Sequence, residues 1–365
     1  MQNYESAELS AEQLEAHFRA DEAKGLMICT TEAEAKRQYG EHSVLIAAMG
    51  AIMKPNGDIR PLHDGTHGIG LNNRIRIQDA LHFKGGITVD FIGYHIAYQG
   101  WAAGISERRA GWIIGWIDDC EAGGWMIAGR RLTEFTGRLN FVARLLLWIR
   151  PFLAPLFSFQ AVLNRGTVAR APTMVCIALT FLRSELKKGS RLESVLQPWP
   201  DPRQAFRTDA KCETGRVVLA GWSLKKGLKP SDAAWFAVEI LPSQLPWLFK
   251  EDGSSQWAST TAELLASYAA LHAFGHLATN GRRDNLRLVV NAGTDNRSTP
   301  AIQQKGLSNK WPVQAVHMQM VSRLHACHKI CRLQWRPREE NVEADDLTNF
   351  KFEKFSLANR IIVEL

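Results

Sequence analysis

The second half of the chain contains a group of short apolar runs followed by alternating helical and strand-like segments. Three strands are expected first, over residues 205–210, 217–222 and 234–240. After them come helix, strand, helix, strand and helix, over about 260–277, 286–292, 312–327, 330–335 and from 341 onward. This order predicts an α/β fold in which flanking helices cover a mixed, five-stranded sheet.

Four isolated carboxylates lie at the ends or on the faces of these segments. Asp209 lies within the first strand and Glu263 on the apolar helix that follows the three strands. Asp295 comes directly after the fourth strand, and Asp345 lies in the last helix. One such residue is more often a turn or cap than a ligand. Four together suit hard divalent cations, and a phosphodiester cleaved in line uses two such ions a few ångströms apart. The set predicts metal-assisted hydrolysis of a nucleic acid backbone.

Residues 203–350 resemble the ribonuclease H domain of reverse transcriptases. The resemblance rests on the residues around each acid, in the segments 208–210, 261–265, 294–296 and 341–348. It implies a ribonuclease H-like fold and an endonuclease that cuts the RNA strand of an RNA–DNA hybrid, recognised through helix shape and the 2′-OH. The implied cofactor is Mg²⁺, bound as two ions, with Mn²⁺ able to replace it.

The same resemblance implies a role for each acid. Asp209 is expected to bridge both ions, and Glu263 with Asp295 to complete one of the two sites. Asp345 is expected to hold the ion that activates the attacking water. Many members of the family carry a His in the loop before the last helix, where this chain has Arg-Pro-Arg-Glu-Glu. That difference concerns product release rather than the chemistry of cleavage.

Two alternatives remain for the same acids. An integrase or transposase of this fold class would use fewer acids and would lack the Asn-x-x-Ala-Asp-x-Leu pattern that begins at Asn341. A catalytically inactive retroelement remnant would keep the fold and only bind nucleic acid. Fold analogy alone decides neither case.

The first half resembles other parts of a retroelement reverse transcriptase. Residues 54–64, followed by 71–73, are similar to the fingers segment, in which residues equivalent to Lys54 and Arg60 contact nucleotide or template. Residues 89–94, 104–106 and the helices up to 157 are similar to the region after the catalytic palm, which leads into the thumb.

The palm itself has no room in this sequence. Between Asn73 and Phe91 the chain passes almost directly from the fingers-like segment to the strand that follows the palm. The segment 116–119, Trp-Ile-Asp-Asp, imitates a polymerase turn, but it ends a predicted helix and comes after that strand. RNA-directed DNA polymerase activity is therefore predicted to be absent, and an intact reverse transcriptase acting in trans remains a candidate partner.

We expect six segments along the chain. They are a helical N-terminal extension (1–45), a truncated fingers-like segment (46–90), a post-palm strand with thumb- or connection-like helices (91–196), a linker (197–204), the ribonuclease H-like domain (205–350) and a C-terminal tail (351–365). A strand is expected over 87–96, where the second segment passes into the third. Helices are expected over 106–120, 132–149 and 173–188, with Pro151 ending the second of them.

The charge balance favours a polyanionic partner. The formal net charge is +7, with basic residues spread along the chain. Contacts to nucleic acid are expected from two sets of side chains. The first set consists of Lys54 and Arg60 in the fingers-like segment, together with Asn296, Arg336, Arg338 and Asn341 near the acids. The second set, on the thumb-like helices, consists of Arg108, Arg109, Arg130, Arg131 and Arg138.

Neither a membrane span nor a metal-binding cysteine framework is expected. The longest apolar region, 139–163, is broken by Arg144, Arg150, Pro151 and Pro155. The six cysteines are scattered, which is typical of a reducing intracellular setting. The His and Cys residues within 325–331 are packed too closely for a tetrahedral zinc site. The sequence predicts a soluble, intracellular protein.

Overall fold

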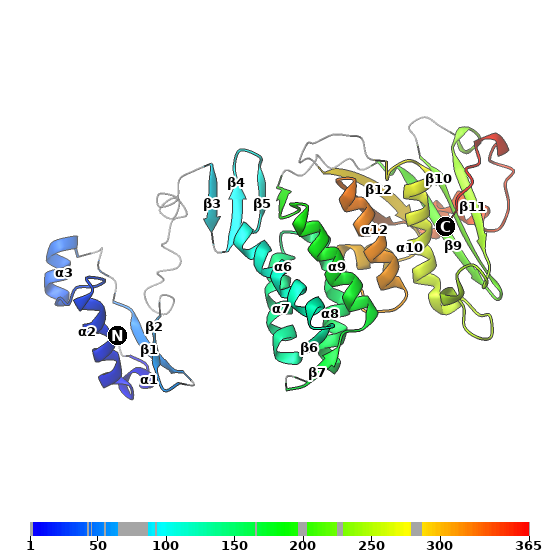
Figure 1. The fold of residues 1–365 in the computed structure, drawn as a ribbon. Coiled ribbons are helices and arrows are strands. Elements are labelled where there is room, and N and C mark those ends of the chain that lie inside the picture. The colour runs from blue at the N-terminus through cyan, green and yellow to red at the C-terminus, as the bar shows by residue number, and fades with distance from the viewer. Residues whose placement is uncertain are drawn as a thin grey trace. The chain divides into compact units, whose positions relative to one another are not determined.

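The computed structural model describes residues 3–41, 44, 46–54, 56–64, 87–91, 93–164, 166–195, 203–224, 229–278 and 287–364. The chain forms two compact units, Met1–Gly86 and Ile87–Leu365 (Figure 1). The expected segment 71–73 and most of the expected linker 197–204 lie outside the described residues.

The first unit is a β-hairpin packed against short helices. Its small core joins Ala7, Leu14 and Ile59. The expected turn between two extended segments is confirmed, and Gly57 takes the positive φ of 84° that this turn requires. The elements are α1 (Glu5–Glu8), α2 (Ala11–Ala23), α3 (Glu32–Tyr39), β1 (Ala48–Met53) and β2 (Ile59–Asp64).

The second unit begins with a small antiparallel sheet in the order β3-β4-β5-β8. The expected single strand over 87–96 is wrong, because the chain reverses between Phe91 and Tyr94, which are paired. Gly93 makes the reversal possible with a φ of 84°, a value that other residues rarely adopt. The strands are β3 (Thr88–Phe91), β4 (Tyr94–Ala97), β5 (Ala102–Gly104) and β8 (Leu192–Ser194).

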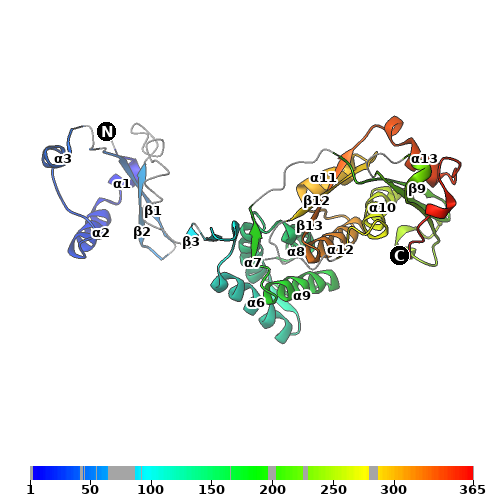
Figure 2. The ribbon, with the colours of Figure 1, turned by 90° about the horizontal axis from the view of Figure 1, so that it is seen from above.

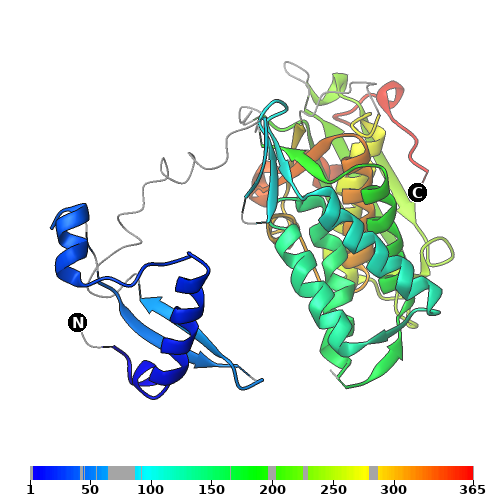
Figure 3. The ribbon, with the colours of Figure 1, turned by 60° about the vertical axis from the view of Figure 1, so that its left-hand side comes forward.

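Four helices follow and lie next to one another (Figure 3). They are α6 (Glu107–Ala122), α7 (Gly129–Val142), α8 (Arg150–Val162) and α9 (Thr173–Lys187), with the paired strands β6 (Met126–Ala128) and β7 (Val168–Arg170) between them. The expected first and last helices are confirmed, and the Ser106 side chain accepts a hydrogen bond from the Arg109 N–H as an N-cap. Residues 116–119 lie inside α6, as their helical context predicted.

The expected helix over 132–149 is wrong in its second half. Helix α7 ends at Val142, and a 3-10 helix η1 (Leu147–Ile149) leads directly into α8. Pro151 lies in the first turn of α8 instead of ending a helix. A proline is tolerated there because the first turn leaves its backbone N–H groups without helical partners.

The rest of the unit is a mixed five-stranded sheet, as the sequence predicted, and its strand order is β11-β10-β9-β12-β13. β9, β10 and β11 are antiparallel, whereas β12 runs parallel to both β9 and β13. The strands are β9 (Phe206–Glu213), β10 (Arg216–Ser223), β11 (Trp235–Ile240), β12 (Leu288–Thr294) and β13 (Lys329–Trp335).

Helices cover both faces of this sheet (Figure 2). Helices α10 and α12 pack on the larger apolar core, which includes Phe206 and Leu264, while α13 packs on a smaller cluster that includes Trp222 and Trp235. The helices are α10 (Ser259–Ala273), α11 (Ser298–Lys305), α12 (Val313–Ala326) and α13 (Val342–Thr348). Single 3-10 turns are η2 (Pro230–Asp232), η3 (Pro246–Leu248), η4 (Gln256–Ala258), η5 (Arg338–Glu340) and η6 (Leu357–Asn359).

Among the described residues, no helix has the length and apolar character needed to cross a membrane.

Replacing the first residue of β9 tests this packing. Phe206 is fully buried in the core under α10, so Phe206→Ala should lower the free energy of unfolding by about 3–5 kcal/mol. Leu288→Ala, on β12 of the same sheet with 48% of the residue exposed, should stay within about 0.5 kcal/mol. Urea unfolding followed by tryptophan fluorescence measures both. Equal effects of the two substitutions would contradict the described core.

Candidate metal centre

The candidate site lies where β9 loses its parallel neighbour. β12 pairs with β9 at only three positions, and the last pair is Thr294 with Thr208. Asp209 is the next residue of β9, and Asp295 is the next residue after β12. The end of this pairing therefore brings the two carboxylates to the same point of the sheet.

Helix α10 brings the third acid to this point. The helix crosses β9 closely enough for the Ser267 and Thr208 hydroxyl oxygens to lie 3.2 Å apart. Glu263 lies one turn before Ser267, and its carboxylate accepts hydrogen bonds from the Thr294 hydroxyl, at 3.3 Å, and from the Ala210 backbone N–H. Glu263 thus reaches the edge of β9 that is left open where the pairing with β12 ends at Thr294.

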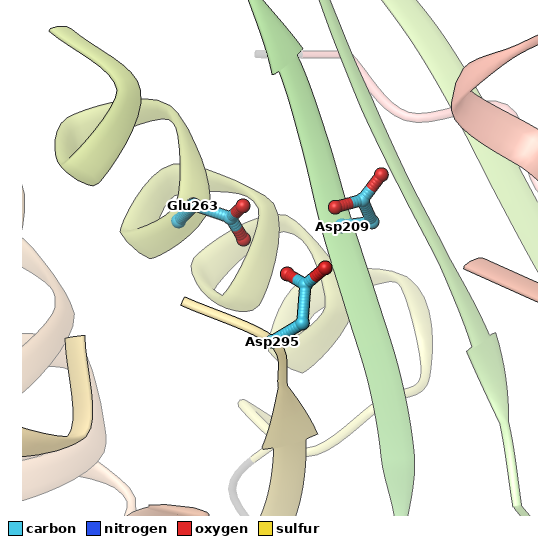
Figure 4. A group of neighbouring side chains, drawn as sticks. All are labelled: Asp209, Glu263 and Asp295. Carbon is cyan, nitrogen blue, oxygen red and sulfur yellow. The ribbon is translucent and has the colours of Figure 1, made fainter. Parts of the chain in front are cut away.

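Asp209, Glu263 and Asp295 converge at this edge (Figure 4). One carboxylate oxygen of each lies within 4.8 Å of the others. Asp209 and Glu263 are each only 6% exposed, and Asp295 is half-buried. The three acids that the sequence singled out are therefore close enough to share a bound ion.

Burial raises the pKa of all three carboxyls, and repulsion from neighbouring acids adds to this effect. Burial is the largest cause at Asp209 and, with the charges of Asp295 and Asp345, it raises the Asp209 pKa to about 6 although Thr348 opposes the shift. Burial and then the charges of Asp209 and Asp295 raise the Glu263 pKa well above its usual range. The Asp295 pKa is raised by burial, against the Arg338 guanidinium.

The surroundings of the three acids fit a divalent cation. Within the described part of the chain, none of the three forms an ion pair with Lys, Arg or His. Two of them accept hydrogen bonds from hydroxyl groups: the Thr348 hydroxyl lies 2.7 Å from Asp209 Oδ2, and the Thr294 hydroxyl contacts Glu263. Buried carboxylates without an ion-pair partner are costly, and a hard cation with oxygen ligands offsets that cost.

The fourth predicted ligand lies beside this group instead of within it. Asp345 is outside the set of atoms within 4.8 Å, although its charge acts on Asp209 and Asp295. Its neighbour Asp346 is turned to Lys354, with an Oδ2–Nζ distance of 2.8 Å. The structure thus places Asp345, and not Asp346, beside the acids.

The predicted nucleic-acid contacts near the acids already have partners within the fold. Asn341 is buried and donates from Nδ2 to the Thr208 carbonyl at 3.0 Å, which fixes the start of α13 against β9. Asn296 Oδ1 accepts from the Ser298 backbone N–H at 2.8 Å at the start of α11. Arg336 lies 3.6 Å from a Glu340 oxygen.

The other two predicted contacts lie in the first unit. Lys54 and Arg60 are exposed on either side of the hairpin turn between β1 and β2. Contacts of all these side chains with nucleic acid remain predictions.

Sequence reasoning gave no role to the two threonines that contact the acids. Thr294 and Thr348 occur inside the motifs that carry the resemblance. A threonine next to a predicted ligand on a strand or helix is the only signal that could have found them. Which carboxylate each one contacts depends on how α10 and α13 pack on the sheet.

Comparisons with known proteins give a structural likeness only. Models of known protein families produce no match to this chain, and curated protein sequences produce none either. The structure is similar to ribonuclease H1 from the halophilic archaeon Halobacterium salinarum, with 12% identity and a TM-score of 0.28, over 40% of this chain and 96% of that one. It is also similar to the N-terminal ribonuclease H domain of a Mycobacterium tuberculosis protein, with 13% identity and a TM-score of 0.27, over 40% and 93%.

A longer stretch of the chain is similar to a foamy viral protease–reverse transcriptase solved with an RNA/DNA hybrid. The identity is 14% and the TM-score is 0.22, over 68% of this chain and 29% of the viral one. Values this low carry no functional argument. The fold assignment rests instead on the order and direction of the five strands.

The raised pKa of Asp209 predicts an unusual pH dependence of stability. The folded-state pKa of about 6 lies above the ordinary value of 3.8, so the folded state binds the proton more tightly and stability falls as pH rises from about 4 to about 6. Without divalent ions, Asp209→Asn should therefore be more stable than the unaltered protein by up to about 3 kcal/mol at pH 8, and by little at pH 4.

Urea unfolding in EDTA at both pH values measures this difference. Asp346→Asn is the control, because Asp346 is paired with Lys354 and lies outside the acid group. A gain for Asp209→Asn that is the same at pH 4 and pH 8 would contradict the electrostatic explanation.

Proposed function

We propose that the region 205–350 is a two-metal endonuclease of the ribonuclease H type, which cleaves the RNA strand of RNA–DNA hybrids. The observation that carries the proposal is the convergence of Asp209, Glu263 and Asp295, from three different elements, within 4.8 Å. Carboxylates at this spacing suit two hard cations about 4 Å apart, the arrangement that in-line phosphodiester cleavage uses.

Each acid has a defined place in this proposal. Asp209, whose pKa responds to both Asp295 and Asp345, would contact both ions, while Glu263 and Asp295 would hold one of them. Asp345 would hold the second from the α13 side. Bound Mg²⁺ would supply Lewis-acid stabilisation of the phosphate and activation of water.

The protein contributes orientation and the correct ionisation state. The Thr348 hydroxyl favours the ionised form of Asp209, and the Ala210 N–H and Thr294 hydroxyl do the same for Glu263. Asn341 and Thr348 join α13 to β9, so the acids from the two elements keep a fixed separation. Because ionised acids are the form that binds cations, activity is expected to fall in acid.

The thumb-like helices supply a candidate surface for the duplex backbone. Arg108 and Arg130 are exposed on α6 and α7. The Arg138 guanidinium lies 4.2 Å from the centre of the Trp112 ring, on the wall of a cavity of about 610 Å³. Backbone contacts from such guanidinium groups would make binding salt-dependent and independent of base sequence.

Cleavage of a labelled hybrid tests the proposal directly. With Mg²⁺, the full chain should cut the RNA strand of an RNA–DNA hybrid and leave double-stranded DNA intact. Asp209→Asn should lower the rate about 1000-fold or more, since several kcal/mol of metal-dependent stabilisation are lost.

Asp346→Asn is the matched control and should cleave like the unaltered protein, because Asp346 faces Lys354. Folded protein that binds the hybrid without cutting it would support the inactive, nucleic-acid-binding alternative. Equal rates for Asp209→Asn and the unaltered protein would show that the site is elsewhere.

The hydroxyl of Thr348 predicts a second kinetic effect. Thr348→Val keeps the shape of the side chain but removes a hydrogen bond to the Asp209 carboxylate, worth about 1.5–3 kcal/mol. The acid limb of the pH–rate profile should then move up by about 1–2 pH units. Thr133→Val is the control, since the Thr133 hydroxyl donates to the Gly129 carbonyl in its own helix. An unchanged acid limb for Thr348→Val would exclude this role.

A further inference from the structure

One guanidinium group lies directly against the fourth acid. Arg338 is in η5, in the loop between β13 and α13, and its side chain is 75% exposed. Its Nη2 atom donates to Asp345 Oδ1 at 2.6 Å. The same guanidinium also acts electrostatically on Asp209 and Asp295.

The two oxygens of Asp345 have different partners. Oδ2 accepts from Asn349 Nδ2 at 3.1 Å, and the same Nδ2 lies 2.7 Å from the Asp345 carbonyl oxygen. Asn349 is held in turn by Lys211, whose Nζ donates to Asn349 Oδ1 at 2.9 Å. Asn349 therefore orients the carboxylate without help from Arg338, and Oδ1 is the oxygen that Arg338 occupies.

We propose that Arg338 competes with a divalent cation for Asp345 Oδ1, so that the second ion binds only when the guanidinium is displaced. This inference rests on the proposed function, because it concerns the ion expected at Asp345. It makes Arg338 a positioning residue that regulates metal occupancy.

Because Arg338 is exposed, its ion pair with Asp345 opposes binding of the second ion only weakly. An ion pair with an exposed arginine contributes little, and salt screens it further. A divalent cation can therefore displace the guanidinium, and its removal should strengthen the second binding step modestly. If Arg338 only stabilised the fold, its removal would have the opposite effect: loss of a supporting contact would loosen Asp345 and weaken binding of the second ion.

Direct binding of Mn²⁺ tests the proposal in the full chain without nucleic acid. Isothermal titration at low salt should show that Arg338→Ala binds the second ion about two- to fivefold more tightly than the unaltered protein. Arg338→Lys should stay close to the unaltered protein because it keeps the charge. The gain in Arg338→Ala should shrink at high salt.

Arg336→Ala is the matched control. Arg336 belongs to the same loop but pairs with Glu340 and Gln334, so its removal should leave the second step unchanged. Equal or weaker Mn²⁺ binding by Arg338→Ala would overturn the proposal, and so would an equal gain from Arg336→Ala.

The hybrid cleavage assay separates this proposal from the proposed function. Tighter Mn²⁺ binding by Arg338→Ala in a protein that cuts no hybrid supports the competition and contradicts the nuclease. Cleavage together with unchanged Mn²⁺ affinity supports the nuclease and overturns the competition.

Discussion

Repulsion among three clustered carboxylates, two of them buried and one half-buried, is the constraint on which the rest of the second unit depends. Asp209, Glu263 and Asp295 come from a strand, a helix and a strand end, and each would be less costly in water than here. The fold holds them together because β12 leaves β9 at Thr294 and opens the edge beside Asp209.

The packing on each face has a different part in holding this arrangement. Phe206 and Leu264 belong to the large core under α10, so apolar burial fixes Glu263 over the sheet. On the other face α13 is short, and polar contacts from Asn341 and Thr348 tie it to β9. The acid on α10 is therefore held by the large hydrophobic core, whereas the acid on α13 is held by a smaller apolar cluster together with specific hydrogen bonds.

Much of this could be predicted from the sequence, where the signal is local. The five strands follow from short apolar runs, and the acids stand out because they interrupt them. The predictions that were wrong concern features that depend on long-range packing or on a single backbone angle. Gly93 turns an expected strand into a hairpin, and Pro151 starts a helix because α7 has already ended. The partners of the acids, Thr348 and Arg338, were beyond prediction because they depend on where α13 and its preceding loop pack.

Helices α6–α9 are supported by the sheet domain through α12. Met318 of α12 belongs to the apolar core of these helices, and His325 of the same helix stacks on Trp148 with ring centroids 4.5 Å apart. A mostly buried ion pair joins Arg287, just before β12, to Glu193 of β8. Since removing one partner of such a pair leaves a buried charge, the pair favours keeping both regions in one unit. Helices α6–α9 thus pack on α12 and the sheet domain within the same unit.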